Sequence, residues 1–344
     1  MKPIDRSSIV LVLCVTGSGL LCGSAAADDF PQAAAAAQFS AVHGFKDAAQ
    51  PRLRRATSMD TGVASQLIKE LCAASCSTPS DTVEGGERRI ESDRWSLHIA
   101  VDGSWARFRD LEVSRRAHSL AKDPSQKMSA DALEKAGHGF IAAKLGSTII
   151  LAADEQLVPV RTDYRFEGGQ DMNTGEVTTS IVANRIVFGR TIRGVPVVGG
   201  GSAVVITFAN DGSVESFQYD WPAYEVMQRQ NVISASEILR RVQTVIATRG
   251  ISTPTISPMV SDTGETPYPI ALTADTTLVK LECGYYDPGV QILTASAQIQ
   301  PGCVYHAVYQ DANGMRQGLA GAVPAGIQFD PDAAWPESLI LTSH

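Results

Sequence analysis

The amino-acid sequence predicts an α+β protein in which helices pack on antiparallel sheets. Three apolar runs at residues 186–190, 202–208 and 213–219 are separated by turn-forming residues, a pattern typical of an antiparallel meander. Amphipathic helices are predicted to begin at Ser129 and at Ser234, and strand-like runs follow each of them. We therefore expect two α+β units, each with one helix packed on an antiparallel sheet, behind an N-terminal helix and hairpin.

The meander is interrupted by Arg193-Gly194, Gly199-Gly200-Gly201 and Asn210-Asp211-Gly212. Glycine adopts positive φ without steric cost, and Asn and Asp tolerate it, so the last tripeptide predicts a tight two-residue hairpin. The triple glycine has no phosphate-loop lysine after it and does not open a helix, so it predicts a bulge or a flexible corner.

Residues 1–27 have the layout of a secretory signal peptide, with Lys2 and Arg6 before an apolar run at 9–21 and small residues at 25–27. The apolar run is shorter than the roughly 20 residues that a helix needs to cross a bilayer. Residues 28–58 contain few large apolar side chains and predict a flexible leader. The mature chain is therefore expected to be secreted or periplasmic, without membrane insertion.

The charge balance bears on the kind of partner. The formal net charge is −8, and removal of Lys2, Asp5 and Arg6 with the signal peptide leaves −9. Nucleic acids and anionic membranes are bound by basic patches, and none of the arginine pairs in this sequence extends into such a patch. These two classes of partner are therefore not expected.

The mature chain carries four cysteines, Cys72, Cys76, Cys283 and Cys303. An even number of cysteines in an oxidising compartment predicts disulfides, and four cysteines allow three connectivities. We favour the local pairs Cys72–Cys76 and Cys283–Cys303, because the second pair lies in adjoining strand-like runs. The spacing lacks the CxxC of a zinc site, so no metal is expected.

The N-terminal region, residues 59–125, contains one predicted helix and one predicted hairpin. The helix is indicated by Val63, Leu67 and Leu71, and the hairpin by alternating apolar residues on either side of Asp102-Gly103. The first α+β unit is predicted at residues 126–228. Its helix runs from Ser129 to Gly146, and Gly137-His138-Gly139 in the middle predicts a close approach of the sheet.

The second α+β unit is predicted at residues 229–344. Ser234 and Glu237 form a capping box, and Gly250 ends the helix. Four prolines at 254–269 exclude regular structure there. Further strands are expected at 277–286, 291–298, 303–310 and 317–322, with a hairpin turn at 311–314.

The segment Arg193-Gly194-Val195-Pro196-Val197-Val198-Gly199, a strand, Asn210-Asp211-Gly212 and a short valine-containing strand resemble the core of the fungalysin/thermolysin propeptide (FTP) domain. In that family a helix-plus-sheet PepSY unit comes next, and the helix at Ser234 is similar to its opening. The resemblance implies two cystatin-like units that chaperone or inhibit a zinc protease. No two histidines of the mature chain lie within five residues of each other, so the protease domain itself is absent.

Four aromatic residues, Phe217, Tyr219, Trp221 and Tyr224, gather at the end of the meander. The first three alternate along a strand and share one face, which is either core or an open recognition surface. An alternative site is a pocket between the two units, lined by some of Tyr164, Arg190, Asp220, Tyr285 and His306.

The sequence contains no Gly-x-Ser-x-Gly elbow, and Ser119-Leu120-Ala121-Lys122 lacks the companion motifs of penicillin-recognising enzymes. We therefore expect a secreted, non-catalytic binding module without cofactor or metal, which inhibits or chaperones a secreted protein or peptide such as a protease. One alternative is a secreted enzyme of unfamiliar type that uses the pocket. Another is a structural or adhesive module at the cell surface.

Overall fold

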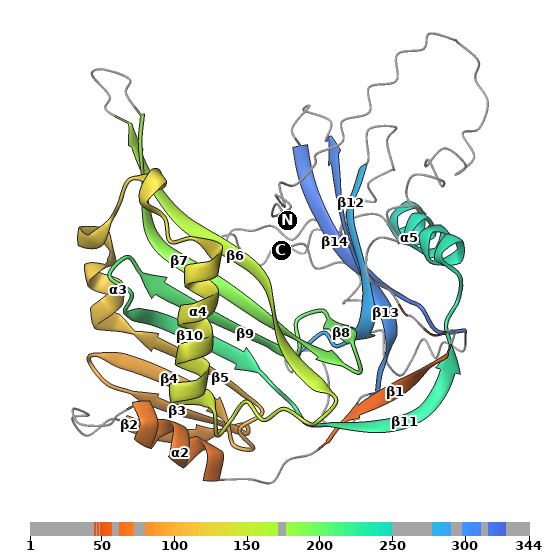
Figure 1. Cartoon of the computed structure of the whole chain (residues 1–344), viewed down its shortest axis with the longest axis horizontal. Coiled ribbons are helices and arrows are strands. Elements are labelled where there is room, and N and C mark those ends of the chain that lie inside the picture. The colour runs from red at the N-terminus through yellow and green to blue at the C-terminus, as the bar shows by residue number, and fades with distance from the viewer. Residues whose placement is uncertain are drawn as a thin grey trace, which may run out of the picture.

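The computed structural model describes residues 45, 47, 49–56, 62–71, 80–170, 177–249, 277–289, 298–310 and 316–327. It has a large, mostly antiparallel sheet and few helices, which confirms the expected combination of helices with antiparallel strands (Figure 1). The signal peptide, Cys72, Cys76, the prolines at 254–269 and the turns at 171–176 and 311–314 lie outside the described residues. No helix in the described ranges is both long and apolar enough to span a membrane.

The strands are β1 Ala49–Arg55, β2 Ser80–Glu84, β3 Glu87–Glu91, β4 Trp95–Ala100, β5 Trp105–Asp110, β6 Glu155–Gln170, β7 Val177–Ile192, β8 Val195–Val198, β9 Ala203–Ala209, β10 Val214–Asp220, β11 Tyr224–Asn231, β12 Thr277–Tyr286, β13 Gln298–Gln310 and β14 Arg316–Pro324. The helices are α2 Gly62–Leu71, α3 Leu111–Ala117, α4 Ala130–Phe140 and α5 Ala235–Arg249. Two 3₁₀ turns, His118–Leu120 and Pro124–Gln126, and a π-helical turn, Ile141–Leu145, complete the list.

The strands follow the order β11-β1-β13-β12-β8-β7-β9-β10-β5-β4-β3-β2, while β14 pairs with β13 and β6 pairs with β7. Strands β2–β7, β9 and β10 form the left part of the molecule in Figure 1, and β12–β14 form the right part. The two parts meet at β8, which pairs antiparallel with β7 and parallel with β12. β1 lies between β11 and β13.

The predicted meander is confirmed, because β7, β9 and β10 are antiparallel neighbours. Its turns differ from expectation. Arg193 and Gly194 are both at positive φ, 55° and 75°, and make the two-residue turn between β7 and β8. The turn at Asn210-Asp211-Gly212 has three residues and only Gly212 at positive φ, so the prediction of a two-residue hairpin there was wrong. A single glycine at the third position, followed by a bulge, closes such a turn without strain in the other two residues.

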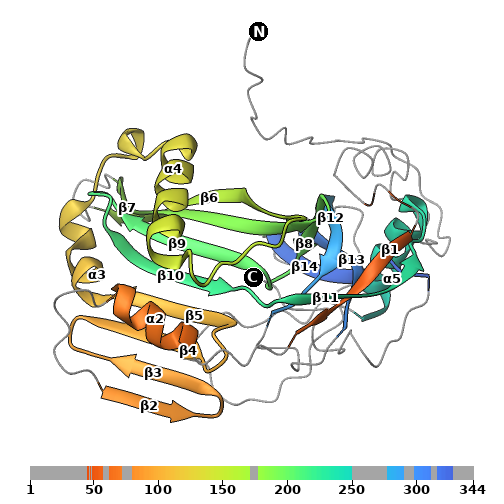
Figure 2. The same ribbon diagram turned by 60° about the horizontal axis from the view of Figure 1, so that its bottom comes forward.

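Helices α2 and α4 cover one face of the left-hand sheet (Figure 2). Ser129 caps α4, and its Oγ accepts a hydrogen bond from the amide of Ala132 (3.2 Å). A Cβ on Gly137 would lie 2.5 Å from a ring carbon of Phe188, so the predicted close approach of the sheet is confirmed at this glycine. Gly139 faces open space and has no such contact. The core beneath includes Leu67, Leu97, Leu133, Ile186, Phe188, Ile206 and Phe217.

The predicted N-terminal helix and hairpin share a sheet and a core with the segment that follows them. Strands β4 and β5 form the expected hairpin, and β5 also pairs with β10 with Phe108 opposite Phe217. Leu67 of α2 lies in the same core as α4. The sheet therefore continues across the boundary expected between residues 125 and 126. β5 pairs with the backbone groups of β10 that would otherwise form an open edge.

Part of the predicted flexible leader is ordered, and the expectation is wrong for residues 49–55. This segment forms β1, which pairs with β11 along most of its length and with β13 at Leu53 and Arg54. Leu53 is fully buried and Arg55 is 5% exposed. The composition of the segment is misleading because one apolar anchor and two ladders of backbone hydrogen bonds are enough to fix a short central strand.

The second core lies between α5 and the strands β12–β14. The Glu237 amide donates a hydrogen bond to Ser234 Oγ (3.3 Å), as expected of a cap, while the Glu237 carboxylate bonds to Arg240. Ile238, Leu239 and Val242 of α5 pack against Tyr305 and its neighbours on the sheet. β12 has the bounds that the sequence predicted, and the predicted strands at 303–310 and 317–322 lie within β13 and β14.

Candidate functional site

The aromatic residues predicted as a recognition surface lie in the core. Phe217, Tyr219 and Trp221 are 2%, 3% and 6% exposed. Phe217 lies beneath Phe140, which follows from α4 covering this face of β10 (5.5 Å between ring centroids). Of the two interpretations of this face, the structure therefore shows the core, and a recognition surface has to be sought elsewhere.

The residues proposed to line a pocket between the units do not all converge. The Tyr164 hydroxyl donates to the carbonyl of Met128 (2.8 Å), and the Tyr285 hydroxyl donates to Gln50 Oε1 (3.3 Å). His306 is an exposed residue of β13, between the buried Tyr305 and Ala307. Arg190 and Asp220 both belong to the surroundings of Tyr224. The Arg190 guanidinium lies 4.8 Å from the Tyr224 ring centroid. Asp220 binds Arg55, and Arg55 also binds Asp287, which accepts a hydrogen bond from the Tyr224 hydroxyl.

Arg190 is a buried cation in β7, only 3% exposed. It forms an ion pair with Glu155 of β6 and donates a hydrogen bond to the carbonyl of Pro222 (2.6 Å). Its guanidinium also lies 4.9 Å from the Trp221 ring centroid and 4.8 Å from that of Tyr224. A guanidinium held in this way stabilises the β10–β11 corner through charge and cation–π contact.

A second buried cation, Arg55 at the end of β1, binds two carboxylates where the two parts of the molecule meet. Its Nε and Nη2 atoms lie 3.1 and 2.5 Å from the two carboxylate oxygens of Asp287, and Nη2 lies 3.2 Å from Asp220. Asp287 is completely buried and follows β12 directly. The Tyr224 hydroxyl bonds to the same Asp287 carboxylate and lies 2.7 Å from Ser202 Oγ.

The electrostatics of this cluster keep the arginine charged and the phenol neutral. Burial alone lowers the pKa of Arg55, but the negative charges of Asp287 and Asp220 outweigh it, so the pKa is raised. Burial raises the pKa of Tyr224 well above its usual value, and the nearby charge of Asp287 raises it further. At neutral pH Arg55 is therefore charged and Tyr224 is neutral, and both donate hydrogen bonds to Asp287.

The triple glycine packs against the Asp287 loop. A Cβ on Gly199 or Gly200 would lie 2.4 or 2.8 Å from the carbonyl oxygens of Asp287 and Pro288, and one on Gly201 would overlap the Asp287 carboxylate. The Gly201 amide donates to the Asp287 carbonyl (2.8 Å). The expected bulge or corner is therefore a site of close backbone approach, which explains why three glycines are needed.

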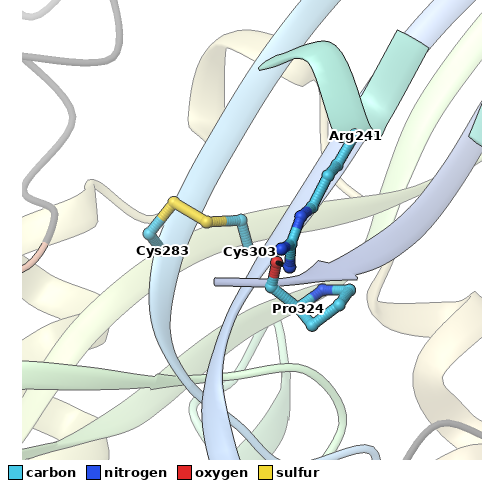
Figure 3. Close-up of a disulfide and its surroundings, with 4 residues drawn as sticks. All are labelled: Arg241, Cys283, Cys303 and Pro324. Carbon is cyan, nitrogen blue, oxygen red and sulfur yellow. Dashed lines mark hydrogen bonds between the residues drawn. A yellow bond between two sulfur atoms is a disulfide. The ribbon is translucent and has the colours of Figure 1, made fainter. Parts of the chain in front are cut away.

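The disulfide Cys283–Cys303 is present, as predicted, and joins directly opposite residues of β12 and β13 (Figure 3). Arg241 of α5 donates a hydrogen bond to the carbonyl of Pro324 at the end of β14 (3.0 Å; Figure 3). The bridge fits an oxidising, extracytoplasmic location. In the described part of the chain, no cluster of three or more His, Cys, Asp or Glu side chains is placed to hold a metal ion.

The outer edge of β6 is a long open edge of the sheet. This strand has 16 residues and, within the described ranges, pairs with β7 alone. Every residue from 155 to 168 is at least partly exposed, and the large apolar side chains of Val160 and Phe166 are 53% and 52% exposed. The upper part of the β6–β7 hairpin projects beyond the neighbouring strands (Figure 1). An edge of this length offers backbone donors and acceptors to another strand.

No protein-family profile and no curated protein matches the chain. The sequence predicted only some of the residues in the buried cluster around Arg55 and Arg190. Arg190, Asp220 and Tyr224 were identified, but Arg55 was assigned to the leader and Asp287 carried no signal except its place before Pro288-Gly289. The edge at β6 had no signal at all, because a strand becomes an edge only through the order of its neighbours.

Proposed function

We propose that this protein is a non-catalytic binding module that acts outside the cytoplasm and holds an extended segment of another secreted protein at the edge of β6. The partner segment adds a strand to the sheet, so backbone hydrogen bonds supply most of the affinity. Val160 and Phe166 supply apolar contacts at the same edge. The observation that carries this proposal is the length and exposure of a strand paired with β7 alone in the described residues.

The resemblance to the FTP and PepSY domains supports the same function. The matching residues form the β7–β8 turn with β8, and the β9–β10 hairpin, so the motif occupies a meander beneath a helix. Under this proposal the two helix-on-sheet units are cystatin-like, and the partner is a protease that the module inhibits or chaperones. The segment that it holds is extended.

The enzyme alternative has weaker support, because the charged groups that were expected to act on a substrate are engaged within the protein. Arg190 forms an ion pair with Glu155, and Asp220 forms an ion pair with Arg55. The adhesive alternative needs a contiguous apolar patch. The most exposed large apolar residues instead come from separate elements, among them Val83 of β2, Ile150 before β6 and Val226 of β11.

The test uses the mature protein with a photo-reactive amino acid at residue 166, incubated with the secretome of its native source. We expect a crosslink to a partner protein. The same probe at Val83, which is 65% exposed on the strand at the opposite edge of the sheet, is the matched control. Phe166→Asp should weaken capture of that partner about tenfold, as expected for loss of one interfacial anchor, and Val83→Asp should not. Equal crosslinking from both positions would contradict the proposal.

A further inference from the structure

We infer that two copies of this chain pair through β6, antiparallel and in a single register, about a two-fold axis that passes Tyr164. The partner is thus a second copy of the chain, and the two sheets become one continuous sheet. This pairing uses the edge proposed above for binding another protein, but it is argued from the charges along β6 and does not depend on that function.

The relevant part of β6 is a regular strand. The pairing of β6 with β7 shifts register at two places. At the first, Pro159 is opposite Phe188 and Arg161 is opposite Val187, so the extra residue is Val160 of β6. At the second irregularity, Arg165 is opposite Ala183 and Phe166 is opposite Ile181, so the extra residue there belongs to β7. Residues 161–168 therefore run without a bulge, and alternate side chains point to opposite faces.

Charges of alternating sign occupy one face of this segment, at Arg161, Asp163, Arg165 and Glu167. A two-fold antiparallel pairing centred on residue 164 places Arg161 opposite Glu167 of the second copy, and Asp163 opposite Arg165 of the second copy. By symmetry each pair occurs twice. Opposite charges directly across a ladder stabilise the pairing of two strands.

The same charges exclude the neighbouring registers. A centre at residue 163 would place Arg161 opposite Arg165 of the second copy and Asp163 opposite itself. A centre at residue 165 would place Asp163 opposite Glu167 and Arg165 opposite itself. A shift by a single residue would join the charged face of one copy to the uncharged face of the other. One register is therefore favoured over all its neighbours.

The four charged side chains have local partners, yet they remain accessible. Arg161 and Arg185 share Asp163, at 3.0 and 2.7 Å, while Arg165 binds Glu215 and Glu167 binds His118. The side chains of Arg161, Arg165 and Glu167 are 61%, 46% and 41% exposed, and that of Asp163 is 29% exposed. Because Arg161 and Arg185 share Asp163, Glu167 of the second copy would give Arg161 an ion-pair partner that it does not share.

The uncharged face of the segment is complementary as well. In the proposed register Phe166 lies opposite Thr162 of the second copy and diagonal to its Tyr164. The Phe166 ring, which is 52% exposed in the single chain, is then covered. Burial of a large exposed ring on both sides of the axis adds a hydrophobic contribution to the backbone pairing. Since the dimer occupies the β6 edge of both copies, only the dissociated chain offers that edge to other proteins.

The test is analytical ultracentrifugation of the purified mature chain, without any partner, at low salt. We expect a concentration-dependent dimer. Arg161→Glu and Glu167→Arg should each raise the dimer dissociation constant about tenfold or more, because each replaces two attractive pairs by two repulsive ones. An equimolar mixture of the two variants should form heterodimers, since the carboxylates of one chain then face the guanidinium groups of the other at both pairs. The double variant should dimerise like the wild type.

Glu84→Arg on β2 is the matched control for a charge reversal at the opposite edge, and it should leave the dimer unchanged. A chain that stays monomeric at about 0.1 mM, well above the micromolar range of an ordinary specific complex, would overturn the inference. A dimer that the single reversals do not weaken, or variants that do not associate when mixed, would overturn it too. The crosslink to a partner protein is measured separately, so the two proposals fail independently.

Discussion

Arg55 and Asp287 lie 232 positions apart in the chain and form a buried, two-pronged ion pair. The arginine ends β1 and the aspartate follows β12, so the pair fastens the N-terminal strand to the C-terminal part of the sheet. Tyr224 and Asp220 bond to the same two groups from the β10–β11 corner. One buried cluster therefore joins three segments that are remote in sequence.

Removing one member of this ion pair should destabilise the protein strongly. Arg55→Ala leaves the Asp287 carboxylate buried without its cation, and we expect a loss of about 3–5 kcal/mol in the free energy of unfolding. Denaturant melts measure it. The matched control is Arg54→Ala in the same strand, whose pair with Glu225 is about half exposed and should contribute at most about 1 kcal/mol. Equal effects of the two substitutions would contradict a special role for Arg55.

Alkaline pH should destabilise the fold. Burial raises the pKa of Tyr285 to about 12, while the unfolded chain has a tyrosine pKa near 10. The folded state therefore keeps a proton that the unfolded state loses. The stabilisation is complete below pH ~10 and falls by about 1.4 kcal/mol per pH unit between pH ~10 and ~12 for this one group.

Urea melts at several pH values between 9 and 12, within that titration range, measure the effect of the tyrosine proton. Tyr285→Phe should make the pH dependence less steep, and the steepness that remains should come from other buried tyrosines, since burial also raises the pKa of Tyr219 and Tyr286. An identical pH dependence in Tyr285→Phe and the wild type would contradict the assignment.

The Cys283–Cys303 bridge should contribute about 3 kcal/mol, because it closes a loop between residues 20 positions apart. The double variant Cys283→Ala/Cys303→Ala should unfold at correspondingly lower denaturant concentration and still bind the same partners. Reduction of the wild type is a poorer test, because the chain also contains Cys72 and Cys76, which we expect to pair. Alkylation of unreduced mature protein, followed by mass spectrometry, should find no free thiol. Labelling of Cys283 or Cys303 would contradict the structure.

Two neighbouring helix glycines should respond in opposite ways. Gly137→Ala places a methyl group 2.5 Å from the buried Phe188 ring, so we expect a loss of about 1–3 kcal/mol despite the better helix propensity of alanine. Gly139→Ala points into open space and should stabilise the protein by about 0.5–1 kcal/mol. Thermal melts of the two variants check both signs. A gain from Gly137→Ala would mean that α4 does not lie against β7 at this distance.

The sequence by itself determined the local elements. Ser129 and Ser234 mark the starts of α4 and α5 because a hydroxyl cap acts within one turn of helix. The bounds of β12 followed from strand alternation, and the pairing of Cys283 with Cys303 was the one favoured because the two strand-like runs adjoin. In each case the residues that interact are near one another in sequence, so composition and spacing carry the information.

Only the tertiary structure decided which surfaces are open and which charges are buried. Arg55 belongs to a segment whose composition predicts a leader, and it becomes a buried cation because β11 and β13 lie on either side of β1. Phe217 and Tyr219 become core because α4 covers that face of β10. The long edge of β6 exists because β9 and β8 occupy the other side of β7. Burial and exposure depend on how separate segments of the chain pack against one another, and local patterns do not encode that packing.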